Sequence, residues 1–308
     1  MSDQGKVKPT APMPSTPQEL ADLGLFEARY YDTYRIAGLV KELIENPFEY
    51  IRQLEGFYVD DERYTFLEPF PKESHFHKLI RFVIEEIMAE DQNDFDLDEV
   101  KNKVGDSEKT SDSRPNKYLF SPLEMAFENH HIEFQSFHEW ILDQDRKFES
   151  ATANDLYDYY CETRLTQDFE DLISKMVEEV FYITFLNRKL MRDFNKMMAV
   201  IVVSNIKVTE TPAEYKRHLK RDGILRRVDP PMWAKKAIFF RERGKCAITR
   251  TDLSGLLSTL NKAHYDHIVP LAEGGMNDIS NLQLLAEDVN LKKSASNDET
   301  SIVYERWY

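Results

Sequence analysis

Cysteine is scarce in this 308-residue chain, which contains only Cys161 and Cys246. Two cysteines cannot build the disulfide framework of a small secreted domain, and they suit a reducing cytoplasm. Long apolar runs are absent as well. The longest, residues 197–203, is far shorter than the roughly 18 residues that a membrane helix needs. The composition therefore predicts a cytoplasmic protein that does not enter a membrane.

The first 18 residues lack the apolar segment of a signal peptide and are rich in Pro, Ser, Thr and Lys. This composition predicts a disordered tail. The whole chain has 42% hydrophobic and 12% aromatic residues, which is enough for ordinary hydrophobic cores. Its length allows two domains, and no internal repeat with the spacing of a solenoid is present.

Basic residues are too few to balance the acidic ones, and the net charge is −15. The imbalance is confined to one part of the chain. Residues 216–308 carry 16 basic and 12 acidic side chains, a net +4, whereas residues 1–215 carry 24 and 43, a net −19. The acidic part repels DNA over a Debye length of about 8 Å. We expect it to bind a protein partner or activator rather than to be the main DNA-binding surface.

The acidic part is expected to be mostly helical, because its apolar residues recur with a period near 3.6. The predicted helices cover residues 17–55 with a break at Pro47, then 75–90, 97–104, 122–148, and 154–203 with one break. Four basic residues on one side of the last helix could contact phosphate or an acidic surface of the same chain: Arg188, Lys189, Arg192 and Lys196.

A basic segment follows and ends in a Pro-Pro pair, which is typical of a domain boundary. We therefore predict a tail (1–18), an acidic helical domain (19–215), a basic linker (216–230) and a C-terminal domain (231–308). Arg226 and Arg227 in the linker are candidates for contacts with DNA phosphates.

The C-terminal part contains an ordered set of polar residues and turn signals. The set comprises Asp266, His267, Pro270, Gly274, Gly275, Asn281 and Asn290. Proline and the Gly-Gly pair indicate a turn. We expect a strand that ends near His267, followed by a turn and a last helix over about residues 286–294.

This set resembles the ββα-metal, or HNH, endonuclease family over about residues 231–295. The resemblance implies that a phosphodiester is hydrolysed with one divalent ion, Mg²⁺ or Mn²⁺. It implies Asp266 and Asn290 as metal ligands and His267 as the general base. A histidine near its usual pKa of about 6.5 can take a proton from water at neutral pH. Asn281 would anchor the loop and orient His267.

Many members of this family also bind a structural zinc ion through two Cys-x-x-Cys pairs. Here Cys246 fills the first position, but Thr249, Ala286 and Val289 fill the others. One cysteine cannot form a four-ligand zinc site, so we predict no structural zinc. The motif would instead be held by apolar packing of Ile248, Leu253, Ile268, Val269, Leu282, Leu284, Leu285 and Val289.

Four lysines near the motif are further candidates for contacts with DNA phosphates. Lys292 and Lys293 follow Asn290 on the last predicted helix. Lys235 and Lys236 lie on a helix predicted over residues 232–243, before the motif.

We therefore expect a mainly α chain with a small α+β HNH domain that cleaves one or both strands of DNA. HNH domains make few base contacts, so the target would be chosen by the N-terminal domain or a partner. This arrangement looks like the effector of a bacterial anti-phage or restriction-type system. Three alternatives stay open: a sequence-specific nuclease acting alone, a partner-binding protein with an inactive DNA-docking HNH domain, and a toxin whose acidic domain masks its nuclease.

Overall fold

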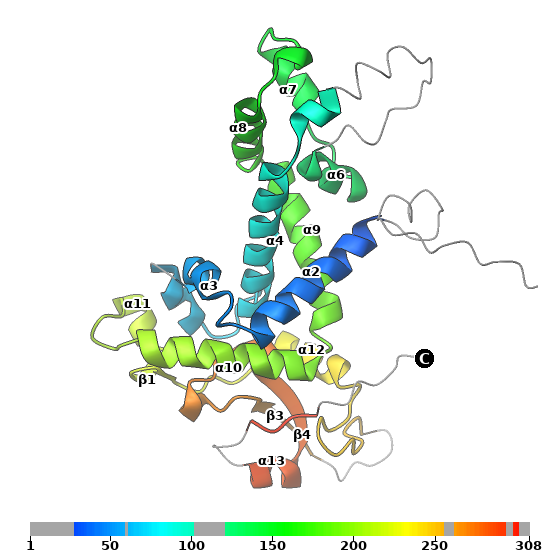
Figure 1. Ribbon diagram of the computed structural model, residues 1–308. Helices are drawn as coiled ribbons and strands as arrows, with labels where there is room; N and C mark the ends of the chain where they lie inside the picture. The colour runs from blue at the N-terminus through cyan, green and yellow to red at the C-terminus, as the bar shows by residue number, and fades with distance from the viewer. Residues whose placement is uncertain (1–27, 59–60, 102–120, 256–261, 294–297, 302–308) are drawn as a thin grey trace, which may run out of the picture. The chain divides into compact units, whose positions relative to one another are not determined.

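A computed structural model describes residues 28–58, 61–101, 121–255, 262–293 and 298–301. The chain is mostly helical, with two small antiparallel sheets in its C-terminal part (Figure 1), which confirms the predicted fold class. The predicted tail, residues 1–18, lies outside the described residues. Among the described helices, none is long and apolar enough to cross a bilayer.

The contacts divide the chain into two compact units. The first contains residues 1–35 and 90–172, and the second contains residues 36–89 and 173–308. The second unit therefore holds the predicted HNH segment together with helices from the acidic part of the sequence. The boundary predicted at residues 216–230 stays a prediction.

The first unit contains α6 (Pro122–Asn129), α7 (Phe137–Asp143) and α8 (Ala153–Thr163), with the short 3-10 helix η3 (Phe148–Ser150). The single helix predicted over residues 122–148 is wrong, because Ser136 starts a second helix. The Ser136 hydroxyl accepts a hydrogen bond from the Glu139 N–H (3.2 Å), and the Glu139 carboxylate accepts one from the Ser136 N–H (2.9 Å). This reciprocal capping box satisfies N–H groups that a helix start leaves unpaired. The helix predicted at 97–104 is present over residues 97–101, and the rest lies outside the described residues.

Four further helices follow the predicted periodicity. They are α2 (Ala28–Glu45), α3 (Ile51–Tyr58), α4 (His75–Asn93) and α9 (Gln167–Thr184). The break at Pro47 is confirmed, since α2 ends before it and α3 begins after it. The helix predicted over residues 154–203 is broken twice rather than once. Side chains of Thr166 and Asn187 accept N-cap hydrogen bonds, and the second of these starts α10 (Arg188–Asn205).

The second unit has an aromatic core between its helices. Phe76 of α4 and Phe194 of α10 are fully buried, with ring centroids 5.1 Å apart, and Phe181 of α9 stacks against His77. The C-terminal elements of this unit are β1 (Leu219–Arg221), β2 (Ile224–Leu225), α12 (Met232–Arg241), β3 (Ala263–His267), β4 (Leu282–Ala286) and α13 (Glu287–Lys293). Short helices accompany them: α11 (Ala213–Lys216) precedes β1, and η4 (Leu271–Glu273) and η5 (Ile279–Asn281) lie between β3 and β4. Another short helix, η1 (Asp61–Leu67), lies between α3 and α4.

Helix α10 is joined to the C-terminal elements by buried polar contacts. Arg188 forms an ion pair with Glu242 (2.6 Å), and Glu242 also accepts a hydrogen bond from Arg241 (2.9 Å). Further along α10, the amide of Asn195 donates to the Ser280 hydroxyl (3.1 Å). The helix therefore lies against the predicted motif in Figure 1 because specific buried bonds hold it there.

The basic residues on α10 meet carboxylates of the same chain. Lys189 lies 3.0 Å from Glu45 and 2.6 Å from Asp193, and Lys196 lies 2.8 Å from Asp298. The patch therefore combines local ion pairs on an exposed helix face, such as Lys189 with Asp193, with contacts to carboxylates from distant parts of the chain. The apolar residues expected to hold the motif are also buried, except Ile248 and Val289, which are half-buried.

The Glu242 pair gives a first prediction. We expect Glu242→Ala to lower the free energy of unfolding by about 3 kcal/mol, because it leaves two buried guanidinium groups without their counter-charge. Urea unfolding of the full chain measures this loss. Glu210→Ala, which removes an exposed pair with Lys207 (3.5 Å), should cost no more than about 1 kcal/mol. Equal losses in the two variants would contradict the assignment.

His75 gives a prediction about pH. Its ring is fully buried edge-on to Phe66, and burial lowers its pKa, an effect that the nearby Asp278 only partly opposes. In the unfolded chain His75 binds a proton near pH 6.5, whereas in the folded chain it binds one only at a lower pH. The folded state therefore loses stability as the pH falls below about 6.5. The urea concentration at the unfolding midpoint should decrease when the pH is lowered from 7.5 to 5.5. The decrease should be smaller in His75→Phe than in the wild type. The same pH response in both proteins would show that His75 does not contribute.

Candidate active site

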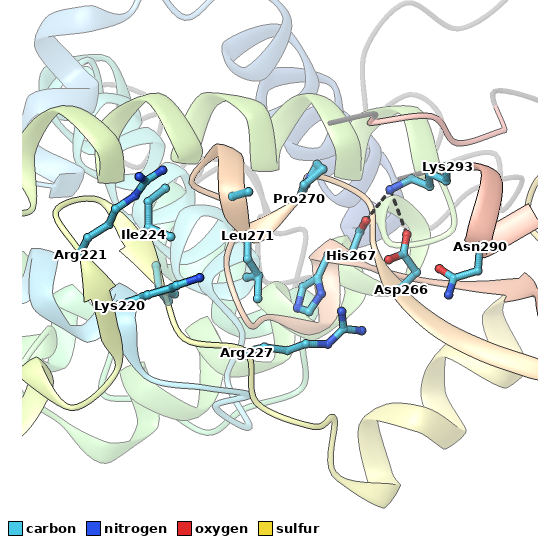
Figure 2. Close-up of a pocket in the computed structure, with 12 residues that line it drawn as sticks. Lys220, Arg221, Ile224, Arg227, Asp266, His267, Pro270, Leu271, Asn290 and Lys293 are labelled. Carbon is cyan, nitrogen blue, oxygen red and sulfur yellow. Dashed lines mark hydrogen bonds and ion pairs between the residues drawn. The ribbon is translucent and has the colours of Figure 1, made fainter. Parts of the chain in front are cut away.

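The predicted motif folds around the end of strand β3. This strand pairs with β4 in antiparallel register, with Asp266 opposite Gln283 and His267 opposite Leu282. Side chains of neighbouring strand residues point to opposite faces. Asp266 and His267 nevertheless border the same cavity of about 540 Å³, because they lie where the strand ends and the chain turns away (Figure 2).

Asn281 holds the loop that follows the strand. Its buried side-chain oxygen accepts a hydrogen bond from the Val269 N–H (2.8 Å), and its amide donates to the carbonyl oxygens of Val269 (3.0 Å) and Met276 (2.9 Å). Two of these bonds therefore fix the backbone at Val269, two residues beyond His267, and the third fixes it at Met276, at the far end of the loop. This geometry supports the predicted anchoring role.

The Gly-Gly pair is required by close packing. A Cβ on Gly275 would lie 2.1 Å from the Val269 carbonyl oxygen. Gly274 has a φ of +90°, and a Cβ there would lie 2.6 Å from Val203 and 2.9 Å from the Ala199 carbonyl oxygen, both on α10. The predicted turn is therefore present, and it is pressed against that helix.

His267 is held neutral and accessible to the cavity. Its side chain is nearly buried, with 3% of the residue exposed. Burial lowers its pKa to about 4, helped by the charge of Arg227 and opposed by Asp266 and by a hydrogen bond that the ring donates to the Asn277 side chain. Among the described residues, none is hydrogen-bonded to its buried Nε2 atom. A neutral imidazole nitrogen is therefore free to accept a proton from a molecule in the cavity.

Lys293 lies beside these groups on α13. Its buried ammonium is 2.9 Å from the Asp266 carboxylate and donates hydrogen bonds to the carbonyl oxygens of His267 (2.7 Å) and Ile268 (3.2 Å). Lys293 thus donates two hydrogen bonds to backbone carbonyl oxygens and forms an ion pair with Asp266. These bonds tie α13 to the end of β3, and a phosphate contact by Lys293 stays a prediction.

The residues present fit a hard divalent cation. Asn290 borders the same cavity from α13, and Figure 2 shows its amide beside the Asp266 carboxylate. A carboxylate and an amide oxygen are suitable ligands for Mg²⁺, which keeps its other positions for water and phosphate oxygens. No cluster of three or more His, Cys, Asp or Glu side chains occurs within the described ranges.

The match to a known family agrees with this geometry. A family model described as HNH endonuclease matches residues 252–296. The C-terminal region contains an HNH domain. The match is narrower than the expected residues 231–295 and does not extend into the N-terminal region. No curated protein and no solved structure matches the chain.

Several predicted phosphate contacts lie away from the HNH cavity. Arg227 borders it, whereas Arg226, Lys235, Lys236 and Lys292 do not. Lys292 is exposed and lies 4.0 Å from Asp288. Arg226 is exposed too, and its backbone carbonyl accepts a hydrogen bond from Asn277. The roles predicted for these four residues stay predictions.

Sequence reasoning missed the residues that join the HNH domain to other segments of the chain. Asn277 bonds the backbone at Arg226 and Val228, and Asp278 accepts hydrogen bonds from Ser280 and from the His75 N–H (3.0 Å). A weak signal existed, because Asp and Ser two residues apart often form a local cap. Nothing in the sequence indicated that His75, some 200 residues earlier, would be the second partner.

The Asn281 bonds give a prediction. Asn281→Ala leaves three buried backbone groups without partners, and we expect the free energy of unfolding to fall by about 3 kcal/mol. Urea unfolding of the full chain measures it. The control is Asn205→Ala, which removes one exposed hydrogen bond to the Ile201 carbonyl (3.0 Å) and should cost less than about 1 kcal/mol. If Asn281→Ala lowers the free energy of unfolding no more than this control does, the stability of the loop does not depend on Asn281.

Proposed function

We propose that the chain is a metal-dependent endonuclease whose HNH domain hydrolyses phosphodiester bonds of DNA, in one strand or in both. One observation carries the proposal: β3 and α13 bring Asp266, His267 and Asn290 to one cavity. An HNH nuclease domain supports hydrolase activity in general. The substrate, the metal and the roles of these three residues belong to the proposal.

His267 acts as the base in this scheme. A water molecule gives a proton to the unpartnered Nε2 atom as its oxygen bonds to phosphorus, and the bond from phosphorus to the leaving oxygen breaks. The leaving oxygen then takes a proton from solvent. The imidazolium formed at His267 lies beside the Asp266 carboxylate, whose charge favours it.

Asp266 and Asn290 are the proposed ligands of Mg²⁺ or Mn²⁺. The bound ion would neutralise charge on the phosphate and the leaving oxygen. Lys293 fixes the Asp266 carboxylate at the end of β3 through its 2.9 Å contact. This holds the carboxylate in place before the substrate arrives, which reduces the ordering needed on binding.

For the biological setting we propose the effector of a bacterial anti-phage or restriction-type system in the cytoplasm, targeted by the N-terminal region or a protein partner. The support is the −19 charge of residues 1–215, which disfavours a DNA-reading surface there. This part of the proposal rests on domain-level analogy. The partner-binding protein with an inactive HNH domain, the self-masked toxin and the nuclease acting alone remain the alternatives.

A plasmid assay tests the activity. We expect supercoiled DNA to be nicked or linearised by the full chain with Mg²⁺ or Mn²⁺ and not with EDTA. Asp266→Ala and His267→Ala should each lower the rate at least about 100-fold, since a general base alone contributes on the order of 10²–10⁴.

Matched controls come from the same elements. His264→Ala removes a partly exposed histidine of β3, and Asp288→Ala removes an exposed carboxylate of α13. Both should cleave at nearly the wild-type rate. If the Asp266→Ala and His267→Ala variants still cleave the plasmid, the proposed mechanism is contradicted. A chain that binds DNA but never cleaves it would favour the inactive, DNA-docking alternative.

A further inference from the structure

A basic hairpin outside the HNH family match forms part of the same cavity. Lys220 and Arg221 of β1, together with Arg227 just after β2, line it along with Asp266 and His267. Figure 2 draws Lys220 and Arg221 to the left of His267 and Asp266 to its right, with Arg227 below the histidine. The family match begins only at residue 252, so this hairpin lies outside it.

These three cations differ from the basic groups of helix α10. Within the part of the chain that the structure describes, Lys220, Arg221 and Arg227 have no carboxylate at ion-pair distance. Arg188, Lys189, Arg192 and Lys196 all have carboxylate partners. In a chain with a net charge of −15, three positive groups without counter-charges therefore border a cavity that also holds a buried imidazole nitrogen with no hydrogen-bond partner among the described residues.

The hairpin is a built element rather than a loose linker. Leu219, Ile224 and Leu225 are buried, and the Gly223 N–H donates to the Ile206 carbonyl at the end of α10 (2.9 Å). Gly223 has a φ of +63°, and a Cβ there would lie 2.5 Å from the Cα atom of Val203. The backbone of the hairpin therefore sits directly on α10.

An irregularity in β1 explains how two neighbouring cations face one cavity. The pairing with β2 shifts register between Leu219 and Arg221. Such a bulge twists a strand and redirects its side chains, so Lys220 and Arg221 both border the cavity despite being adjacent. A regular strand would send them to opposite faces.

We propose that this hairpin and Arg227 bind the backbone phosphates of the strand that is cleaved, with Arg227 next to the phosphate attacked and Lys220 and Arg221 on a neighbouring phosphate. The inference rests on the proposed nuclease function and names its substrate class: a polynucleotide held by its sugar-phosphate backbone. Contacts of this kind position a strand without reading its sequence. Sequence choice then lies elsewhere.

Binding of a fluorescein-labelled 30-base-pair duplex to the full chain tests the hairpin, measured by fluorescence anisotropy in EDTA across a salt series. The double variant Lys220→Ala/Arg221→Ala should lose about tenfold in affinity, and the slope of log affinity against log salt should fall by about 2, near 1 for each phosphate contact. Lys220→Arg/Arg221→Lys should keep most of the binding.

The matched control is Lys216→Ala/Arg217→Ala, which removes the same two charges from exposed positions that do not line the cavity. It should lose less than about threefold, because only long-range attraction is reduced. Equal losses in the two double variants, or no loss in either, would overturn the proposal. Thermal unfolding checks that each variant is folded, as expected for exposed side chains.

The plasmid assay separates this inference from the proposed function. A chain that binds DNA through Lys220 and Arg221 but does not cleave it would refute the nuclease and retain the hairpin site. A chain that cleaves through His267, yet tolerates Lys220→Ala/Arg221→Ala as well as the control, would retain the nuclease and refute the hairpin site.

Discussion

The arrangement of the HNH domain depends on buried polar contacts with helix α10. Glu242 is fully buried between Arg188 and Arg241, and Asn195 of the same helix reaches Ser280. A buried charge or amide that loses its partner costs several kcal/mol, so slippage of the helix along the domain is strongly disfavoured. These contacts hold the C-terminal elements firmly against α10.

Charge is distributed on two scales in this protein. Over long distances the acidic N-terminal part dominates and disfavours indiscriminate binding to nucleic acid. Within a Debye length of the cavity, the cations without partners and the ion pair at Asp266 determine the local field. The same local field, added to burial, keeps His267 neutral. A polyanion would therefore be attracted only when it lies within about a Debye length of the cavity.

The sequence predicted the chemical part of the site better than its supports. Asp266, His267, Asn281 and Asn290 follow a local order of residue types, and the structure brings three of them to one cavity while Asn281 bonds the loop beneath. The extra helix breaks were missed because single caps such as Ser136 and Asn187 overrode the apolar periodicity. Contacts such as Asn195 with Ser280, 85 residues apart, leave no local pattern and could not be predicted.

Two glycines described above have a joint consequence. Gly223 of the hairpin and Gly274 of the loop after His267 both pack against Val203, with no room for a side chain in either place. One turn of α10, residues 199–203, therefore contacts two segments that border the cavity. The hairpin meets the backbone of Val203, and the loop meets the Val203 side chain and the Ala199 carbonyl oxygen. A shift of α10 would move both segments together, so the width of the cavity depends on the position of this one helix.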